Sequence, residues 1–215
     1  MKSEMNKAKA LKILELLEEA YPQAKCELNY GTPFQLLVST MLSAQSTDKT
    51  VNRITERLFD RYPDVESFLT LSQENLEEEI REIGIYRNKA RNILAMCRDL
   101  VSRFFGEVPA NIEKMMSLPG VGRKTANVVA SNAFGIPALA VDTHVFRVSN
   151  RIGLADSERV EITEEQLTRL IPREMWSRSH HLLIWHGRRI CHAGKPECEI
   201  CSILPYCGFA RKNIK

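Results

Sequence analysis

Apolar residues recur three and four positions apart along most of the chain, and this spacing limits the possible folds more than any other feature. In residues 32–42, Thr32 can cap a helix and Pro33 suits its first position. Behind them Phe34, Leu37, Val38, Met41 and Leu42 share one face of that helix. Similar stripes predict helices over 5–20, 51–58, 76–83, 90–104, 143–152, 164–171 and 174–190, with a capping box from Thr163 to Gln166. Because no stretch reads convincingly as a strand, the sequence predicts an all-α fold.

Length and charge exclude some functions and leave others open. The 215 residues suffice for one large domain or two small ones, and the net charge is only +3. Any surface that binds nucleic acid must therefore come from local clustering of charge. The sequence shows neither an export signal nor an apolar run that could span a bilayer, so we expect a cytoplasmic protein without membrane contact. The acidic stretch 74–82 is expected to be a solvated helix face away from any DNA.

Four of the six cysteines crowd into 17 residues near the C-terminus with the spacing C-x6-C-x2-C-x5-C. They are Cys191, Cys198, Cys201 and Cys207. In a chain expected to remain in the cytoplasm, such clustering favours a metal centre over disulfides. Structural zinc and an iron–sulfur cluster both accept four thiolates, and the spacing does not separate them. Cys97 lies in an apolar stripe and is expected in the core, whereas Cys26 receives no function.

Residues 118–129, LPGVGRKTANVV, predict a tight turn that runs into a helix with its apolar residues facing inward. Gly120 and Gly122 remove side chains where the backbone must turn and where N–H groups can approach a partner. The turn places Arg123 and Lys124 at a helix N-terminus, where positive charge is disfavoured. Two interpretations stay open from the turn alone: a phosphate site, or a plain helical hairpin with two solvated cations.

Further motifs accompany LPGVGRKTANVV and the C-terminal cysteines: MLSAQSTD at 41–48, GIYRNKA at 84–90 and VDTHVFRVSNRIG at 141–153. In these motifs and their order the chain resembles the endonuclease III family of DNA base-excision glycosylases. The resemblance implies two α-helical domains that share a cleft. Residues 26–136 would carry a helix–hairpin–helix motif, and residues 1–25 with 137–215 would hold a C-terminal iron–sulfur cluster loop.

The resemblance also implies a reaction, with Lys124 as its nucleophile. The Lys124 amine would attack the deoxyribose C1′ of a damaged nucleotide and expel the base, and β-elimination from the resulting Schiff base would cut the strand 3′ to the abasic site. An amine attacks only when it is deprotonated, so the pKa of Lys124 would have to be lowered. The expected partial burial, Arg123 and the helix N-terminus would each lower it. Asp142 would face Lys124, accept its proton and stabilise positive charge on the sugar. By residue type alone, Asp142 is equally a helix N-cap.

Contacts with DNA and the cofactor follow from the same resemblance. Gln45 matches the position that inserts into the duplex, Ile85 matches the wedge position, and Gly120, Val121, Gly122 and Arg123 belong to the hairpin. The four clustered cysteines would bind a [4Fe–4S] cluster in a structural role. The loop between the first two ligands is basic in the family, but here Lys195 stands beside Gly194 and Glu197, so its DNA contact is expected to be weak. His180, His181 and His186 are expected to pack or to form hydrogen bonds.

The expected substrate is double-stranded DNA that contains oxidised pyrimidines or abasic sites, on the chromosome, with the enzyme acting as a monomer. Adenine-mismatch glycosylases share the hairpin and the cluster, but they lack a lysine at the Lys124 position and usually carry a further C-terminal domain. A DNA-binding or redox-sensing iron–sulfur protein without enzymatic activity would also explain the hairpin and the cysteines. Such a protein would not explain why Lys124 is paired with Asp142.

Overall fold

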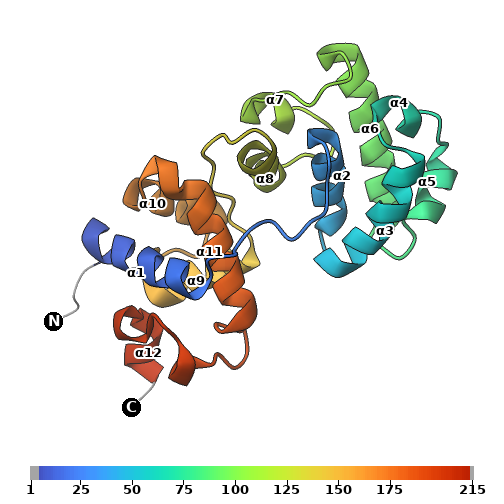
Figure 1. Cartoon of the computed structure of the whole chain (residues 1–215). Helices are drawn as coiled ribbons and strands as arrows, with labels where there is room; N and C mark the ends of the chain where they lie inside the picture. The colour runs from blue at the N-terminus through green and yellow to red at the C-terminus, as the bar shows by residue number, and fades with distance from the viewer. Residues whose placement is uncertain (1–4, 214–215) are drawn as a thin grey trace. The chain divides into compact units, whose positions relative to one another are not determined.

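The computed structural model describes residues 5–213, with side chains described for 5–210, and this part of the chain is helical without a β-strand. The chain divides into two compact units. The continuous unit is Glu27–Ile136, and the split unit combines Met1–Cys26 with Pro137–Lys215. Figure 1 shows the helices of each unit.

The continuous unit is built around one buried helix, α2 (Pro33–Ser43). Thr32 caps α2 by accepting a hydrogen bond from the backbone N–H of Gln35 at 3.2 Å, and Pro33 occupies the first turn as expected. Phe34 and the seven consecutive residues 36–42 are at most 6% exposed, because α2 packs against α3, α6 and α8. The other helices of this unit are α3 (Asp48–Arg61), α4 (Val65–Phe68), α5 (Gln73–Glu79), α6 (Tyr86–Phe104), α7 (Ile112–Met116) and α8 (Arg123–Ala133).

The split unit packs α9 (Thr143–Ile152) against α11 (Trp176–Arg189), with α1 (Lys7–Ala20) on α11 and α10 (Val160–Leu170) on α9. Its core takes Ile13, Leu14 and Leu17 from the start of the chain and joins them to Val145, Val148 and Leu183. Short turns of 3-10 helix, Arg173–Met175, Cys198–Ile200 and Leu204–Tyr206, and the terminal α12 (Gly208–Asn213) complete it. The N-terminal helix therefore folds with the last third of the sequence.

Three details of the helix prediction are wrong. Helix α5 ends at Glu79 and residues 80–84 form turns, although Ile80 and Ile83 are buried and continue the apolar spacing. Helix α10 begins at Val160, so Thr163 is buried inside it and cannot form the predicted capping box. The Gln166 side chain instead accepts a hydrogen bond from the Asp156 N–H at 2.8 Å.

Helix α4 was not anticipated. It is a single turn with a capping box, in which Asp64 accepts from the Ser67 N–H and the Ser67 side chain accepts from the Asp64 N–H. Phe68 at its end is fully buried, with its ring centroid 5.2 Å from that of Phe34 in an edge-to-face contact. Within the described residues, no helix has the length and apolar character needed to cross a membrane.

Candidate functional site

The Leu-Pro-Gly-Val-Gly turn joins α7 to α8 and requires a glycine at position 120. Gly120 has φ +74°, a left-handed conformation that side chains rarely adopt. A Cβ atom at this position would lie 2.8 Å from Cβ of Asn92 and 3.0 Å from Cε of Met41. The hairpin therefore packs closely against α6 and α2, and its shape is fixed by the core of the continuous unit.

The N-terminus of α8 is open toward solvent. Gly122 is its N-cap residue and makes no side-chain capping bond, and a Cβ atom there would meet nothing within 4 Å. The first N–H groups of a helix have no partner inside the helix, so an anion can approach them here. Val121, Ala126, Val128 and Val129 are buried, as the sequence predicted.

Lys124 lies in the first turn of α8, directly after Arg123, and both side chains are exposed. The predicted partial burial of Lys124 is therefore wrong. The reason is local: Lys124 lies in the first turn of α8, beside the open N-terminus, and the buried Val128 on the same face lies one turn further into the helix. The Lys124 amine is therefore open to solvent.

Asp142 is the N-cap of α9, as one of its two interpretations predicted. Its Oδ1 atom accepts hydrogen bonds from the backbone N–H groups of His144 at 2.9 Å and Val145 at 2.8 Å. The side chain is half-buried. Asp142 belongs to the split unit and Lys124 to the continuous unit.

Gln45 and Ile85 both have positive φ angles, 56° and 49° respectively. This conformation is uncommon for glutamine and a real outlier for a β-branched residue such as isoleucine. Both side chains are exposed, with Ile85 at 53% despite its apolar character. Backbone outliers of this kind concentrate at functional sites, and the DNA contacts that the resemblance implies for these two residues stay predictions.

The four clustered cysteines line one cavity in the split unit. Besides Cys191, Cys198, Cys201 and Cys207, its walls include Ile152, His186 and Ile190. Burial raises the pKa of the Cys201 thiol to about 11, so a centre that binds thiolates must displace a proton there. No group of three or more His, Cys, Asp or Glu within the described residues is arranged to hold one metal ion. A donor set of four cysteines in a largely apolar cavity fits an iron–sulfur cluster.

Arginines from α9 hold the segment that begins at Cys191, and sequence reasoning missed them. Arg151 donates to the carbonyl oxygens of His192 and Ala193, each at 2.6 Å, and its Nη1 lies 3.6 Å from the Cys191 sulfur. Arg147 donates to the Cys191 carbonyl at 3.1 Å. Their positions one turn apart on α9 carry no motif, so only the fold reveals this role. Lys195 lies exposed in the same loop, where His192 and Glu197 are in contact at 3.2 Å.

Two of the histidines of α11, His180 and His186, form hydrogen bonds, as expected. Nδ1 of His180 lies 2.7 Å from the Ala140 carbonyl, and Nδ1 of His186 lies 3.0 Å from the Tyr21 hydroxyl. The other ring nitrogen of His186 lies 3.7 Å from the Cys201 sulfur. Burial lowers the pKa of His186 to about 4, so this ring is neutral at pH 7. Cys97 is buried in α6, also as expected.

Comparison with known proteins agrees with these features. Residues 38–173 match the family described as HhH-GPD superfamily base excision DNA repair protein. The chain is 48% identical to endonuclease III of Rickettsia felis over 203 residues, which cover 94% of this chain and 95% of that protein. It is 46% identical to endonuclease III of Escherichia coli K12, over 97% of this chain and 99% of the relative.

Among solved structures, a trapped covalent intermediate between endonuclease III and DNA superposes with a TM-score of 0.94 at 45% identity, and the match covers 98% of this chain and all of that one. A thermostable thymine-DNA glycosylase matches with a TM-score of 0.85 at 25% identity, over 95% of this chain and 98% of that one. The helical fold, the hairpin and the relatives thus lead to one conclusion: the chain belongs to the endonuclease III family of the HhH-GPD superfamily.

Proposed function

We propose that this chain is a DNA N-glycosylase and abasic-site lyase of base-excision repair, with Lys124 as the nucleophile. The observation that carries the proposal is the position of Lys124: an exposed amine in the first turn of a helix whose N-terminus is open beside a glycine hairpin. The hairpin can hold a DNA phosphate on its N–H groups, which brings the sugar of a flipped nucleotide within reach of the amine. The relatives named endonuclease III, and the covalent complex of one with DNA, support the same reaction.

The reaction needs one amine for both of its steps. The nitrogen of Lys124 bonds to C1′ while the bond from C1′ to the base breaks and the base leaves with the electron pair. The C1′–O4′ bond then breaks, with a proton passing from the amine nitrogen to O4′, so that the sugar ring opens and a Schiff base joins Lys124 to C1′. The Schiff base makes the C2′ hydrogen acidic, and loss of this proton expels the 3′ phosphate by β-elimination. The covalent route thereby divides one difficult displacement into easier stages.

Asp142 is proposed as the carboxylate of this reaction. It would accept the amine proton and stabilise the positive charge that develops on the sugar. Its two bonds to N–H groups of α9 fix the direction of the carboxylate. The cap and the catalytic role therefore use the same geometry.

Gln45, Ile85 and the hairpin residues Gly120, Val121, Gly122 and Arg123 are proposed to contact DNA, with a weaker contact from Lys195. The [4Fe–4S] cluster is proposed on the four cysteines, where it would fix the loop between α11 and α12 rather than take part in the reaction. The proposed substrate is duplex DNA with oxidised pyrimidines or abasic sites, and the proposed active form is a monomer. A DNA-binding protein without enzymatic activity would use Lys124 only as a phosphate contact and Asp142 only as a helix cap, and it would form no covalent adduct with DNA.

Borohydride trapping tests the proposal. A duplex with a single thymine glycol is incubated with the protein and borohydride, and covalent adducts are separated by denaturing electrophoresis. Wild type should give an adduct, whereas Lys124→Ala and Lys124→Arg should give none, the arginine variant because it keeps the charge without an amine that can form a Schiff base. Lys114→Ala, which removes an exposed lysine from α7, is the matched control and should still be trapped. Adduct formation by Lys124→Arg, or none by wild type that binds the duplex, would contradict the proposal.

A further inference from the structure

Two segments far apart in the sequence lie side by side in the continuous unit, and each carries a residue with a positive φ angle. The backbone N–H of Gly84 donates to the Ser46 hydroxyl at 3.2 Å. A Cβ atom on Gly84 would lie 3.0 Å from the carbonyl oxygen of Gln45, so the two backbones are in close contact. Because Gln45 and Ile85 flank this contact, the distance between the segments sets the distance between the two residues.

Lys89 joins the same two segments from inside the protein. It lies in the first turn of α6, four residues after Ile85, and its side chain is only 6% exposed. The ammonium group donates to the carbonyl oxygens of Leu42, at 2.9 Å, and of Ala44, at the C-terminus of α2. Carbonyls at the end of a helix have no partner within it, and the negative end of the helix dipole favours a cation.

Burying a lysine has a cost, which indicates that its contacts matter to the fold of this site. Burial lowers the pKa of Lys89 to about 8, well below that of an exposed lysine. An apolar side chain of the same length would fill the space without this cost, but it would leave the carbonyls of Leu42 and Ala44 without their partner. The Lys89 ammonium group thus fixes the path of the backbone in the turn that leads from α2 to Gln45.

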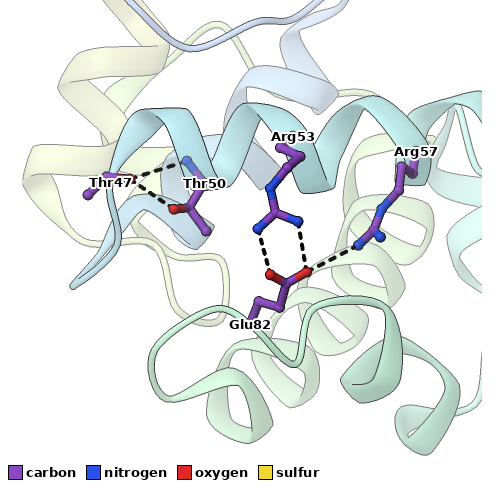
Figure 2. A network of polar contacts seen from close by, with 5 residues as sticks. All are labelled: Thr47, Thr50, Arg53, Arg57 and Glu82. Atoms are coloured by element: carbon purple, nitrogen blue, oxygen red, sulfur yellow. Dashed lines mark hydrogen bonds and ion pairs between the residues drawn. The ribbon is translucent and has the colours of Figure 1, made fainter.

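A second brace acts on the segment that leads to Ile85, from α3. Figure 2 shows both terminal nitrogens of Arg53 facing the carboxylate of Glu82, at 3.0 and 2.5 Å, with Arg57 approaching the same carboxylate at 3.8 Å. The start of α3 is capped by Thr47, two residues after Gln45. The acidic stretch is therefore an ion-paired anchor at this point, where a solvated helix face was predicted. These groups are exposed, so the pair contributes less to rigidity than the buried Lys89.

We propose that Lys89 is a positioning residue for base flipping. It holds the Gln45 and Ile85 segments at a fixed separation and in their left-handed conformations, so that both side chains enter the duplex together when a nucleotide leaves the stack. Strained conformations persist only where the surroundings determine them, and Lys89, Ser46 and Glu82 supply those surroundings. This inference rests on the proposed function, since it assigns a task to residues that the proposed function places on DNA.

The test compares a substrate that requires filling of the gap with one that does not. Single-turnover cleavage at one abasic site is measured in a duplex and in the same strand alone, for wild type, Lys89→Met and the conservative variant Lys89→Arg. Lys89→Met should slow duplex cleavage about tenfold or more, because small misplacements of this kind are costly, and it should leave single-strand cleavage unchanged. Lys89→Arg keeps a donor and should recover part of the duplex rate.

Two further variants separate positioning from general stability. Leu100→Ala opens a cavity in the same helix, eleven residues from Lys89, and should affect both substrates to the same extent. Gly84→Ala forces the segments apart at the Gln45 carbonyl while Lys89 stays in place, so it should reproduce the selective loss on duplex even if Lys89→Met folds poorly. In a Gln45→Ala background the effect of Lys89→Met should shrink, because Lys89 then has less to position.

Equal losses on duplex and single strand for both Lys89→Met and Gly84→Ala would overturn the inference. Full additivity of Lys89→Met with Gln45→Ala would do the same. A wild-type protein that cleaves neither substrate and forms no borohydride adduct would instead contradict the proposed function. The two failures are therefore distinguishable within one set of measurements.

Discussion

At the scale of single residues, Asp142 combines a structural and a chemical role that two substitutions can separate. Asn caps helices as well as Asp does, so Asp142→Asn should leave the free energy of unfolding nearly unchanged while removing the negative charge. Asp142→Ala removes both, and we expect it to cost about 1 kcal/mol of stability as well. Urea unfolding gives the stabilities, and single-turnover base release gives the chemistry. If Asp142→Asn releases the base at the wild-type rate, Asp142 serves only as the helix cap and has no role in the reaction.

The shifted pKa of His181 predicts how the free energy of unfolding depends on pH. Burial, with further effects from His180 and Arg178, lowers the pKa of His181 to about 3 in the folded state, against 6.5 for an unperturbed histidine. Below pH 6.5, His181 therefore binds a proton in the unfolded chain but stays neutral in the folded chain. The free energy of unfolding should consequently fall as the pH falls. The slope approaches about 1.4 kcal/mol per pH unit for this one group. Urea unfolding between pH 7.5 and 5 should show a smaller slope for His181→Gln, and equal slopes would refute the assignment.

At the scale of elements, the hairpin offers two glycines with opposite constraints. Gly120→Ala must place a methyl group 2.8 Å from Asn92 in a left-handed conformation, so we expect a clear loss of stability together with weaker DNA binding. Gly122→Ala projects into open space and should cost much less stability, yet its methyl group would shield the N–H groups of α8. Fluorescence anisotropy with undamaged duplex, at one salt concentration, should show weakened binding for Gly122→Ala. Unchanged affinity for the duplex would mean that the N-terminus of α8 does not contact DNA.

The same elements show where sequence reasoning succeeds and where it fails. The hairpin and the cap of α9 were predicted because their signals are local: glycines at a turn and an aspartate before a helix. The end of α5 was not, since Ile83 reaches the core from a turn and continues the helical spacing. The capping box failed because Gln166 bonds to Asp156, ten residues earlier. Lys89 resembles any lysine of an amphipathic helix until the fold places it beneath the end of α2.

At the scale of the whole molecule, occupation of the cysteine cavity should stabilise the split unit and leave the stability of the continuous unit unchanged. Cys191 and Cys207 are part of the core that also holds Leu14, Val145 and Leu183 in the split unit. The resemblance predicted which cysteines belong together. It could not predict that Arg151 and His186 would contact them, because these contacts arise from the packing of α9 and α11.

Removal of iron from the proposed cluster should therefore loosen α1, α9 and α11 while leaving the continuous unit unchanged. Hydrogen exchange followed by mass spectrometry resolves the two units, because their peptides are separate in sequence. We expect Cys198→Ser to raise exchange within 137–213, and the buried control Cys97→Ala to raise it within 27–136 instead. Since Asp142 caps α9, iron loss should also reduce base release, although we propose only a structural role for the cluster. Uniform exchange across both units after iron loss would mean that the cluster supports the whole chain, and full activity without iron would mean that it does not position Asp142.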